Sequence, residues 1–263
     1  MSKWNAQDYC QHSSEQQKWA RELIAKLALR GDERVLDIGC GDGKVTAEIA
    51  REVPRGSVVG IDSSDDMIRF ASVNFPPGSY PNLGFRLLDA SHLDFGAEFD
   101  VAFSNACLHW IWDHRPVLRG IAEALKPGGK ALLQMGGAGN AGDILAIIDD
   151  LKDAEPWGAY LRGVTFRYGF HHPDDYRRWL RDAGLEPVRV ELIAKDMVHP
   201  GPVGLAGWIR TTWHPYTQAI PESLRQSFID EIVRRYLLGH PLDSRGDVHL
   251  RMVRLEVEAL KPG

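Results

Sequence analysis

The sequence predicts an α/β fold in which a mostly parallel sheet of seven strands carries helices on both faces. Short apolar runs without helical spacing alternate along the chain with segments whose apolar residues recur at helical spacing. The clearest unit is a strand at 35–38, a glycine-rich turn, and then a helix carrying Val45, Ile49 and Val53. With 263 residues and 44% hydrophobic composition, the chain has enough apolar material for the core of one large domain.

Charge and cysteine content argue against several other classes of protein. A net charge of −5 and a pI near 6.1 disfavour nucleic-acid binding, which usually needs a basic face. Cys10, Cys40 and Cys107 have neither the number nor the spacing of disulfides or of a metal site. The sequence shows no signal-peptide core and no apolar stretch of about 18 residues that would span a membrane. We expect a cytoplasmic protein with reduced cysteines and no metal, and a monomer because no long apolar helix face is left over.

The segment before the first strand, residues 1–31, is predicted to be a lid followed by a helix. The helix runs through Trp19, Leu23 and Leu27 and ends near Gly31. Trp4 and Tyr9 precede it, and an aromatic N-terminal segment is able to fold over a bound cofactor and its substrate. The alternative is that both aromatic rings simply pack on the surface of the core.

The turn after the first strand predicts a nucleotide site of a particular kind. Gly39, Gly41 and Gly43 let the backbone turn sharply, and the following helix offers free N–H groups. A dinucleotide site needs Gly-x-Gly-x-x-Gly, but here Lys44 occupies the position of its third glycine. Asp37 precedes the turn, where a carboxylate repels a pyrophosphate but suits an ammonium group.

S-adenosylmethionine carries an ammonium and a sulfonium and no phosphate, so it fits this arrangement. The stretch from Val35 to Gly43 therefore resembles motif I of the class I S-adenosylmethionine-dependent methyltransferases. Within the turn, Cys40 stands where a small residue is needed. The resemblance implies a Rossmann-like fold with S-adenosylmethionine as cofactor and S-adenosylhomocysteine as product.

Two further strands end in acids. Residues 57–62 form a strand ending at Asp62, which is placed to accept both hydroxyl groups of a ribose. Ser63 and its neighbours cap the next helix, in which Met67 lies against an adenine ring or, alternatively, in the core. A third strand at 85–90 carries Asp89 at its carboxyl end. The resemblance implies that this acid, with Ala90 and Ser91, contacts the adenine edge.

The remaining strands complete the sheet. Residues 99–106 form the fourth, and Asn105 and Ala106 at its end should face the methyl group. Pro127-Gly128-Gly129 separates a helix from the fifth strand at 130–135, and 136–142 is a glycine-rich loop. Helices follow at 143–152 and 173–183, then a strand at 186–193. Two or three helices at 201–239 precede a last strand at 248–257.

These elements divide the chain into four parts. Residues 1–31 are the N-terminal lid and helix, and 32–200 form the cofactor-binding α/β core. Residues 201–240 form a helical cap over the substrate pocket, and 241–263 carry the closing strand of the core. The cap is expected because this insertion is too long for a hairpin.

At Phe103-Ser104-Asn105-Ala106-Cys107-Leu108-His109-Trp110 the sequence resembles the trans-aconitate methyltransferase group. Trp208 to Thr212, and the closing strand with Arg251 and Arg254, extend the likeness; these two arginines are three apart, so at most one faces the pocket. The group methylates a carboxylate to an ester. His109 and Trp110 are the catalytic candidates, with His109 orienting the acceptor oxygen or acting as a base. The substrate candidates are Trp4, Tyr9, Arg210 and Trp213.

Three alternatives remain open at the level of sequence. The first is methyl transfer to a hydroxyl, amine or carbon of another small metabolite. The second is a catalytically silent cofactor-binding regulatory module. A dinucleotide-dependent oxidoreductase is disfavoured by Asp37 and Lys44.

Overall fold

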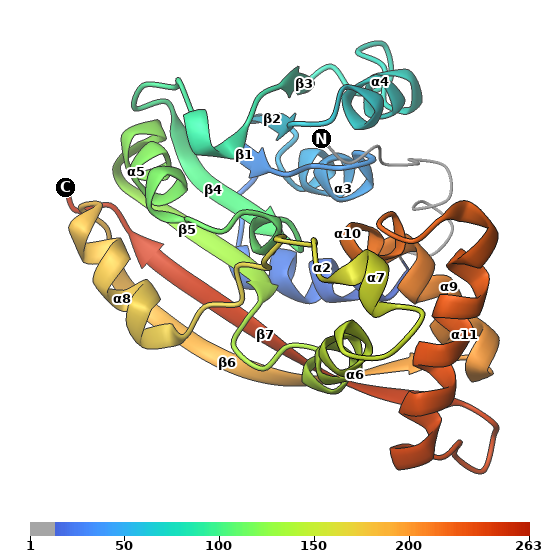
Figure 1. Ribbon diagram of the computed structural model, residues 1–263. Coiled ribbons are helices and arrows are strands. Elements are labelled where there is room, and N and C mark those ends of the chain that lie inside the picture. The colour runs from blue at the N-terminus through green and yellow to red at the C-terminus, as the bar shows by residue number, and fades with distance from the viewer. Residues whose placement is uncertain (1–13) are drawn as a thin grey trace. The chain divides into compact units, whose positions relative to one another are not determined.

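A computed structural model describes the backbone of residues 14–263 and the side chains of residues 19–263. Seven strands form one sheet in the order β3-β2-β1-β4-β5-β7-β6 (Figure 1), and β7 pairs antiparallel with β5 while β1 to β5 are parallel. The predicted fold class is confirmed. The strands are β1 (Arg34–Ile38), β2 (Ser57–Asp62), β3 (Leu83–Leu87), β4 (Phe99–Asn105), β5 (Leu125–Gly136), β6 (Glu186–His199) and β7 (Val248–Leu260).

Helices connect the strands and account for most of the remaining described chain. The α-helices are α2 (Ser14–Leu27), α3 (Lys44–Glu52), α4 (Asp65–Asn74), α5 (Arg115–Ala124), α6 (Gly142–Lys152), α7 (Gly158–Leu161), α8 (Pro173–Asp182), α9 (Gly201–Thr212), α10 (His214–Thr217) and α11 (Glu222–Gly239). Two short 3-10 helices, η1 (Ala90–His92) and η2 (Leu108–Trp110), follow β3 and β4. The insertion at 201–239 therefore holds three helices between β6 and β7.

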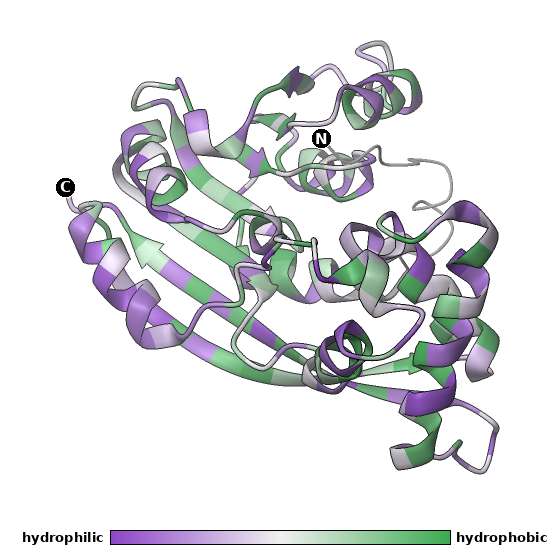
Figure 2. Ribbon diagram, in the orientation of Figure 1, coloured by the Kyte–Doolittle hydropathy of each residue, from purple (hydrophilic) through white to green (hydrophobic). Residues whose placement is uncertain are grey.

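The sheet is covered by an apolar cluster on each face. On one face α2 and α3 bury Leu23, Leu27 and Ile49 against Val35 and Phe103. On the other face α5 and α8 contribute the buried residues Val117, Leu118, Ile121, Tyr176 and Leu180. Figure 2 shows β4 and β5 largely green and α8 largely purple, as expected for central strands beside a helix with one solvated face.

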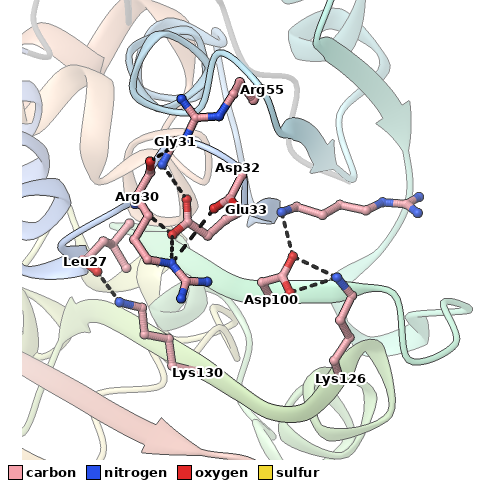
Figure 3. Close-up of polar contacts among 10 residues, drawn as sticks. Leu27, Arg30, Gly31, Asp32, Glu33, Arg55, Asp100, Lys126 and Lys130 are labelled. Atoms are coloured by element: carbon pink, nitrogen blue, oxygen red, sulfur yellow. Dashed lines mark hydrogen bonds and ion pairs between the residues drawn. The ribbon is translucent and has the colours of Figure 1, made fainter.

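The amino ends of the strands are fastened by charged side chains (Figure 3). The Asp100 carboxylate accepts from the backbone N–H of Arg34 and from Lys126 Nζ, each at 2.8 Å. Glu33 accepts from the backbone N–H groups of Arg30 (2.8 Å) and Gly31 (3.0 Å), and Lys130 Nζ contacts the carbonyl of Leu27. This edge is occupied by structural contacts, and the opposite, carboxyl edge carries the candidate site.

Several element boundaries differ from the predictions. The first helix ends at Leu27 rather than near Gly31, because Ala28 adopts a left-handed conformation (φ 48°). The third strand covers 83–87 rather than 85–90, because the Asp89 side chain caps η1 by accepting from Ser91 N at 2.8 Å. The fifth strand begins at Leu125, with a register shift in its pairing with β4, so Pro127-Gly128-Gly129 lies inside it. The sixth strand continues to His199, and α7 was not predicted.

Contacts group the described residues into two compact units. We call residues 14–138, 168–193 and 254–263 the sheet unit, and residues 139–167 and 194–253 the helical unit. The helical unit contains α6, α7, α9, α10 and α11. That it covers a substrate pocket stays a prediction.

Candidate active site

The glycine turn after β1 is bound to the end of β2. The backbone N–H groups of Gly39 and Cys40 donate to the carbonyl of Ile61 at 2.8 and 2.9 Å. Gly41 N donates to Asp62 Oδ2 at 3.1 Å. Gly39, Gly41 and Gly43 all have positive φ, at 77°, 52° and 81°, a region that glycine enters without steric cost. The turn is therefore built for glycine at all three positions.

The surroundings of the three glycines differ. A Cβ on Gly39 would lie 2.0 Å from Cys107 Sγ, and one on Gly43 would lie 2.9 Å from both Ala71 Cβ and Phe85 Cζ. A Cβ on Gly41 would meet no atom within 4 Å. Gly39 and Gly43 are thus required by packing, while Gly41 faces open space in which a ligand has room to approach the backbone.

Two acids lie at this turn in a poorly solvated position. Asp37 is 2% exposed and its Oδ2 accepts from Thr46 Oγ1 at 2.7 Å. Burial raises the pKa of Asp37 to about 7, against the opposing effect of the Thr46 hydrogen bond, and the charge of Asp62 raises it further. Asp62 accepts from Ser64 N at 2.8 Å, and burial raises its pKa as well. A cation beside these carboxylates would stabilise their ionised forms.

We predict that cofactor affinity rises with pH up to about 7. Because the pKa of Asp37 is raised to about 7, the free protein holds a proton there at lower pH, and binding of an ammonium group has to release it. The association constant for S-adenosylhomocysteine should rise roughly tenfold per pH unit between about pH 5 and 7 and level off above. Titration calorimetry across this range measures the slope. The Asp37→Asn variant should bind S-adenosylhomocysteine weakly, with an affinity that does not change with pH. If its affinity still rose with pH, the proton released on binding would come from a group other than Asp37.

The other predicted cofactor residues are distributed over neighbouring strand ends. Met67 is buried and its N–H donates to Ser64 Oγ at 3.4 Å, while Ser63 and Asp89 are exposed. Asn105 ends β4, and Ala106 follows with φ 55°, a conformation that is uncommon for a residue with a side chain. Cys40 and Ala90 are buried and Ser91 is half-buried. Because β3, β2, β1 and β4 are adjacent, these residues share the carboxyl edge of the sheet.

His109 lies at the same edge, in η2 after β4. It is 8% exposed, and its Nδ1 accepts from Gly136 N at 3.3 Å. A backbone N–H only donates, so Nδ1 carries a lone pair and the proton of the neutral ring is on Nε2. Burial lowers the pKa of His109 to about 3, with the charges of Arg254 and His114 adding to the effect. His109 is thus neutral at physiological pH and presents an N–H donor.

Aromatic rings surround His109. Trp110 lies 5.5 Å and Phe170 5.9 Å from its ring, centroid to centroid. Tyr168 and Phe170 stack at 5.0 Å with only 7° between their planes, and Tyr168 is 5.2 Å from Trp110. Tyr168 and Phe170 were not among the predicted site residues. The available signal was the sequence Phe166-Arg167-Tyr168-Gly169-Phe170, which alternates aromatic residues with other residues and lacks helical spacing.

Backbone contacts hold this aromatic segment on η2. Gly169 N donates to the carbonyl of His109 at 2.9 Å, and a Cβ on Gly169 would lie 2.2 Å from the carbonyl oxygen of Ile111. A Cβ on Gly169 would also lie 2.6 Å from Nε2 of His114, whose Nδ1 is 2.5 Å from the Tyr176 hydroxyl in the core. Burial lowers the pKa of His114 to about 4. Segment 168–170 is therefore held against η2 and Ile111.

The two arginines of the closing strand differ sharply in burial. Arg254 is 4% exposed and pairs across the sheet with Gly136, whereas Arg251 is exposed. The Arg254 guanidinium lies 4.4 Å from the centroid of the Trp19 ring.

The four predicted substrate residues lie in the helical unit or outside the described residues. Arg210 is exposed and Trp213 is buried in the helical unit, and their roles stay predictions. Trp4 and Tyr9 lie outside the described residues. Among the residues that the structure describes, no group of three or more His, Cys, Asp or Glu side chains is arranged to hold a metal ion. None of the described helices is both long and apolar enough to cross a bilayer.

Comparisons with known proteins place the chain in a family. Residues 35–129 match the sequence model of a methyltransferase domain. An uncharacterized methyltransferase of Schizosaccharomyces pombe is 32% identical, covering 98% of both chains. The trans-aconitate 2-methyltransferase of Agrobacterium fabrum is 30% identical, covering 98% of this chain and 99% of the relative. The chain belongs to the class I S-adenosylmethionine-dependent methyltransferases.

Solved structures agree on the fold. A putative methyltransferase from Bacillus halodurans superposes with a TM-score of 0.63 at 18% identity, covering 93% of this chain and 99% of the other. Phosphoethanolamine N-methyltransferase 2 of Haemonchus contortus, solved with S-adenosylhomocysteine, superposes with a TM-score of 0.59 at 20% identity. The superposition covers 94% of this chain and 53% of that one. The residues at the carboxyl edge fit the cofactor: open space at Gly41, a buried acid at Asp37, and an acid at the end of β2.

Proposed function

We propose that the protein methylates a carboxylate oxygen of a small organic acid similar to trans-aconitate, giving a methyl ester. The observation that carries this proposal is the state of His109, a buried neutral imidazole whose Nδ1 accepts a backbone hydrogen bond. The identity to trans-aconitate 2-methyltransferases supports it independently.

The chemistry of the acceptor explains why the protonation state of His109 matters. A hydroxyl group has to lose a proton to react, whereas a carboxyl group with a pKa near 4 is already ionised at neutral pH. His109 is a poor base because its pKa is lowered to about 3 and its available nitrogen already holds a proton. Its Nε2–H is suited instead to donating a hydrogen bond to a carboxylate and so to orienting it.

The main contribution of the protein to the reaction rate is then to orient the carboxylate toward the methyl group. S-adenosylmethionine supplies a methyl group on a sulfonium, and the carboxylate lone pair forms the new O–C bond as the C–S electrons return to sulfur. No proton moves. The buried rings of Tyr168 and His109, with Trp110, exclude water from this region. Holding two reactants in line contributes about 7–11 kcal/mol in favourable cases.

Transfer of labelled methyl groups tests the proposal. S-adenosylmethionine with a labelled methyl is incubated with the protein and a panel of small acids, alcohols and amines, and each product is treated with mild alkali. Label released as volatile methanol identifies a carboxyl methyl ester, as we expect. Label retained in the product identifies a different oxygen, nitrogen or carbon acceptor. No label in any product, although S-adenosylhomocysteine still binds, would favour a silent binding module.

The variant His109→Gln distinguishes a role of His109 as hydrogen-bond donor from a role as general base. Glutamine keeps an N–H donor near the position of Nε2 but has no basic nitrogen. We expect the kcat for methyl ester formation to fall by less than about tenfold, because loss of a general base costs about 10²–10⁴-fold. His109→Ala, which removes the donor as well, should lower kcat further. A fall of 10³-fold in His109→Gln, in a variant that melts like the wild type, would contradict the donor role.

A further inference from the structure

A buried polar pair adjoins η2, the short helix that carries His109. His114 Nδ1 and the Tyr176 hydroxyl are 2.5 Å apart, and both residues are fully buried. His114 Nε2 lies 2.9 Å from the carbonyl oxygen of Ile111, the residue that ends η2. Because burial lowers the pKa of His114 to about 4, its ring is neutral at physiological pH. A carbonyl only accepts, so Nε2 holds the ring proton and Nδ1 accepts from the Tyr176 hydroxyl.

This pair caps the carboxyl end of η2. A short helix leaves its last carbonyl groups without partners inside the helix, and His114 supplies a partner for the carbonyl of Ile111. Gly169 completes the packing. A Cβ on Gly169 would lie 2.2 Å from the Ile111 carbonyl oxygen and 2.6 Å from His114 Nε2. The path of the backbone that carries His109 thus depends on where the His114 ring is held.

The Tyr176 hydroxyl also lies against the strand that contacts the His109 ring. Its oxygen is 3.2 Å from Met135 Sδ in β5. The next residue, Gly136, donates its N–H to His109 Nδ1 at 3.3 Å. The Tyr176 hydroxyl therefore adjoins both supports of the His109 ring, its backbone in η2 and its hydrogen-bond donor in β5. All of these residues belong to the sheet unit.

Packing alone does not account for a polar pair at this place. A buried hydroxyl and a buried imidazole lose their hydration, and two apolar side chains of similar size would fill the space without that cost. A satisfied polar pair adds direction, because its hydrogen bonds allow only one arrangement of the groups that they join. A reaction that depends on alignment needs such support, since a displacement of about 1 Å can cost roughly 100-fold in rate.

We propose that Tyr176 and His114 are positioning residues, which hold η2 and the neighbouring part of β5 so that His109 is aligned for methyl transfer. The proposal rests on the proposed function, in which His109 orients the acceptor. The effect of the pair reaches His109 through two backbone groups, the carbonyl of Ile111 and the N–H of Gly136.

The variant Tyr176→Phe tests the proposal with little change in shape, because it removes only the hydroxyl. We expect kcat for methyl ester formation from trans-aconitate to fall by about tenfold or more. KM should change less than about threefold, because the loss is one of alignment rather than of binding. Hydrogen exchange of the Gly136 N–H, followed by NMR, should become about tenfold faster. The ¹⁵N signals of the His109 ring should shift with it.

Replacements of His114 give an independent measurement. His114→Gln keeps an N–H donor for the Ile111 carbonyl, whereas His114→Leu keeps the volume without a donor. His114→Gln should therefore retain more of the wild-type kcat than His114→Leu. If Tyr176 and His114 act as a unit, Tyr176→Phe combined with His114→Gln should lower kcat no further than the more damaging single change. Multiplied losses in the combined variant would contradict the unit.

The variant Tyr236→Phe provides a matched control for the loss of a buried hydroxyl. Tyr236 is 1% exposed in the helical unit, and its hydroxyl donates to the carbonyl of His249 at 2.7 Å. This variant should lower the melting temperature about as much as Tyr176→Phe does. It should leave the exchange of the Gly136 N–H and the signals of the His109 ring unchanged. If the Tyr176 hydroxyl only stabilised the fold, both variants would leave them unchanged.

The outcomes distinguish this proposal from the proposed function. If Tyr176→Phe and His114→Gln keep kcat within about twofold of the wild type, the positioning role is wrong while methyl ester formation stands. An unchanged exchange rate of the Gly136 N–H in Tyr176→Phe would overturn it as well. If the wild type forms no methyl ester from any acid, the proposed function fails. The exchange rate and the His109 ring signals then still decide whether Tyr176 holds His109 in place.

Discussion

Replacing Asp62 with asparagine will weaken binding of S-adenosylmethionine by about 100-fold, since hydrogen bonds to a charged group contribute about 1.5–3 kcal/mol each. The Asp62 carboxylate accepts from Gly41 N and Ser64 N at 3.1 and 2.8 Å. It has further lone pairs for the two ribose hydroxyls assigned to it from the sequence. Asparagine has a single acceptor oxygen, and its NH₂ group would face either a backbone donor or the ribose. Titration calorimetry gives the affinity.

The neighbouring acids provide the comparison. Asp66 is exposed in the first turn of α4, and Asp66→Asn should leave cofactor affinity within about twofold of wild type. Asp89 is also exposed and is expected to make one contact with the adenine amine, so Asp89→Asn should cost about tenfold. An Asp62→Asn variant that binds within threefold of wild type would remove Asp62 from the ribose site.

Replacing Gly39 with alanine will lower the free energy of unfolding by about 3 kcal/mol or more, because overpacking and a strained backbone each cost about 1–3 kcal/mol. The new Cβ would lie 2.0 Å from Cys107 Sγ, and φ at Gly39 is 77°. Chemical denaturation measures the loss. Gly41→Ala provides the contrast, because the added Cβ meets no protein atom within 4 Å.

The variants Gly39→Ala and Gly41→Ala should have different effects on the stability of the protein and on cofactor binding. Gly41→Ala should cost only about 1 kcal/mol of stability for its left-handed φ, yet impair cofactor binding because the methyl group enters the open space beside the turn. Combining Gly39→Ala with Cys107→Gly removes the clashing side chain and should recover part of the stability. Equal stability losses in Gly39→Ala and Gly41→Ala would show that contact with Cys107 is unimportant.

The geometry of the candidate cofactor site could be predicted from the sequence because it depends on local pattern. Asp37, the three glycines and Asp62 are placed by one strand–turn–helix–strand unit, and the short connection fixes how β1 meets β2. The boundary errors arose where side chains compete with the backbone pattern, as at Asp89, which caps η1 instead of continuing β3.

The candidate acceptor side was less accessible to sequence analysis because it is assembled from distant segments. Tyr168 and Phe170 reach His109 only through tertiary packing, across 59 and 61 positions of chain. The sequence pattern left open which of the two arginines in the closing strand faces inward. Only the structure shows that Arg254 is buried, while Arg251 is exposed. The protonation state of His109 likewise depends on its burial and on Gly136.

The place of β7 in the sheet has a consequence for how the protein is made. β7 is the last strand in the sequence, yet it lies between β5 and β6 and pairs with β5 from Lys130 to Gly136. While a ribosome is still adding residues, β5 therefore has a bare edge and β6 has no neighbour to join. The edge of β5 is covered only after β7 has been made. A chain interrupted before β7 would expose unpaired strand edges, which are surfaces that promote aggregation and chaperone binding.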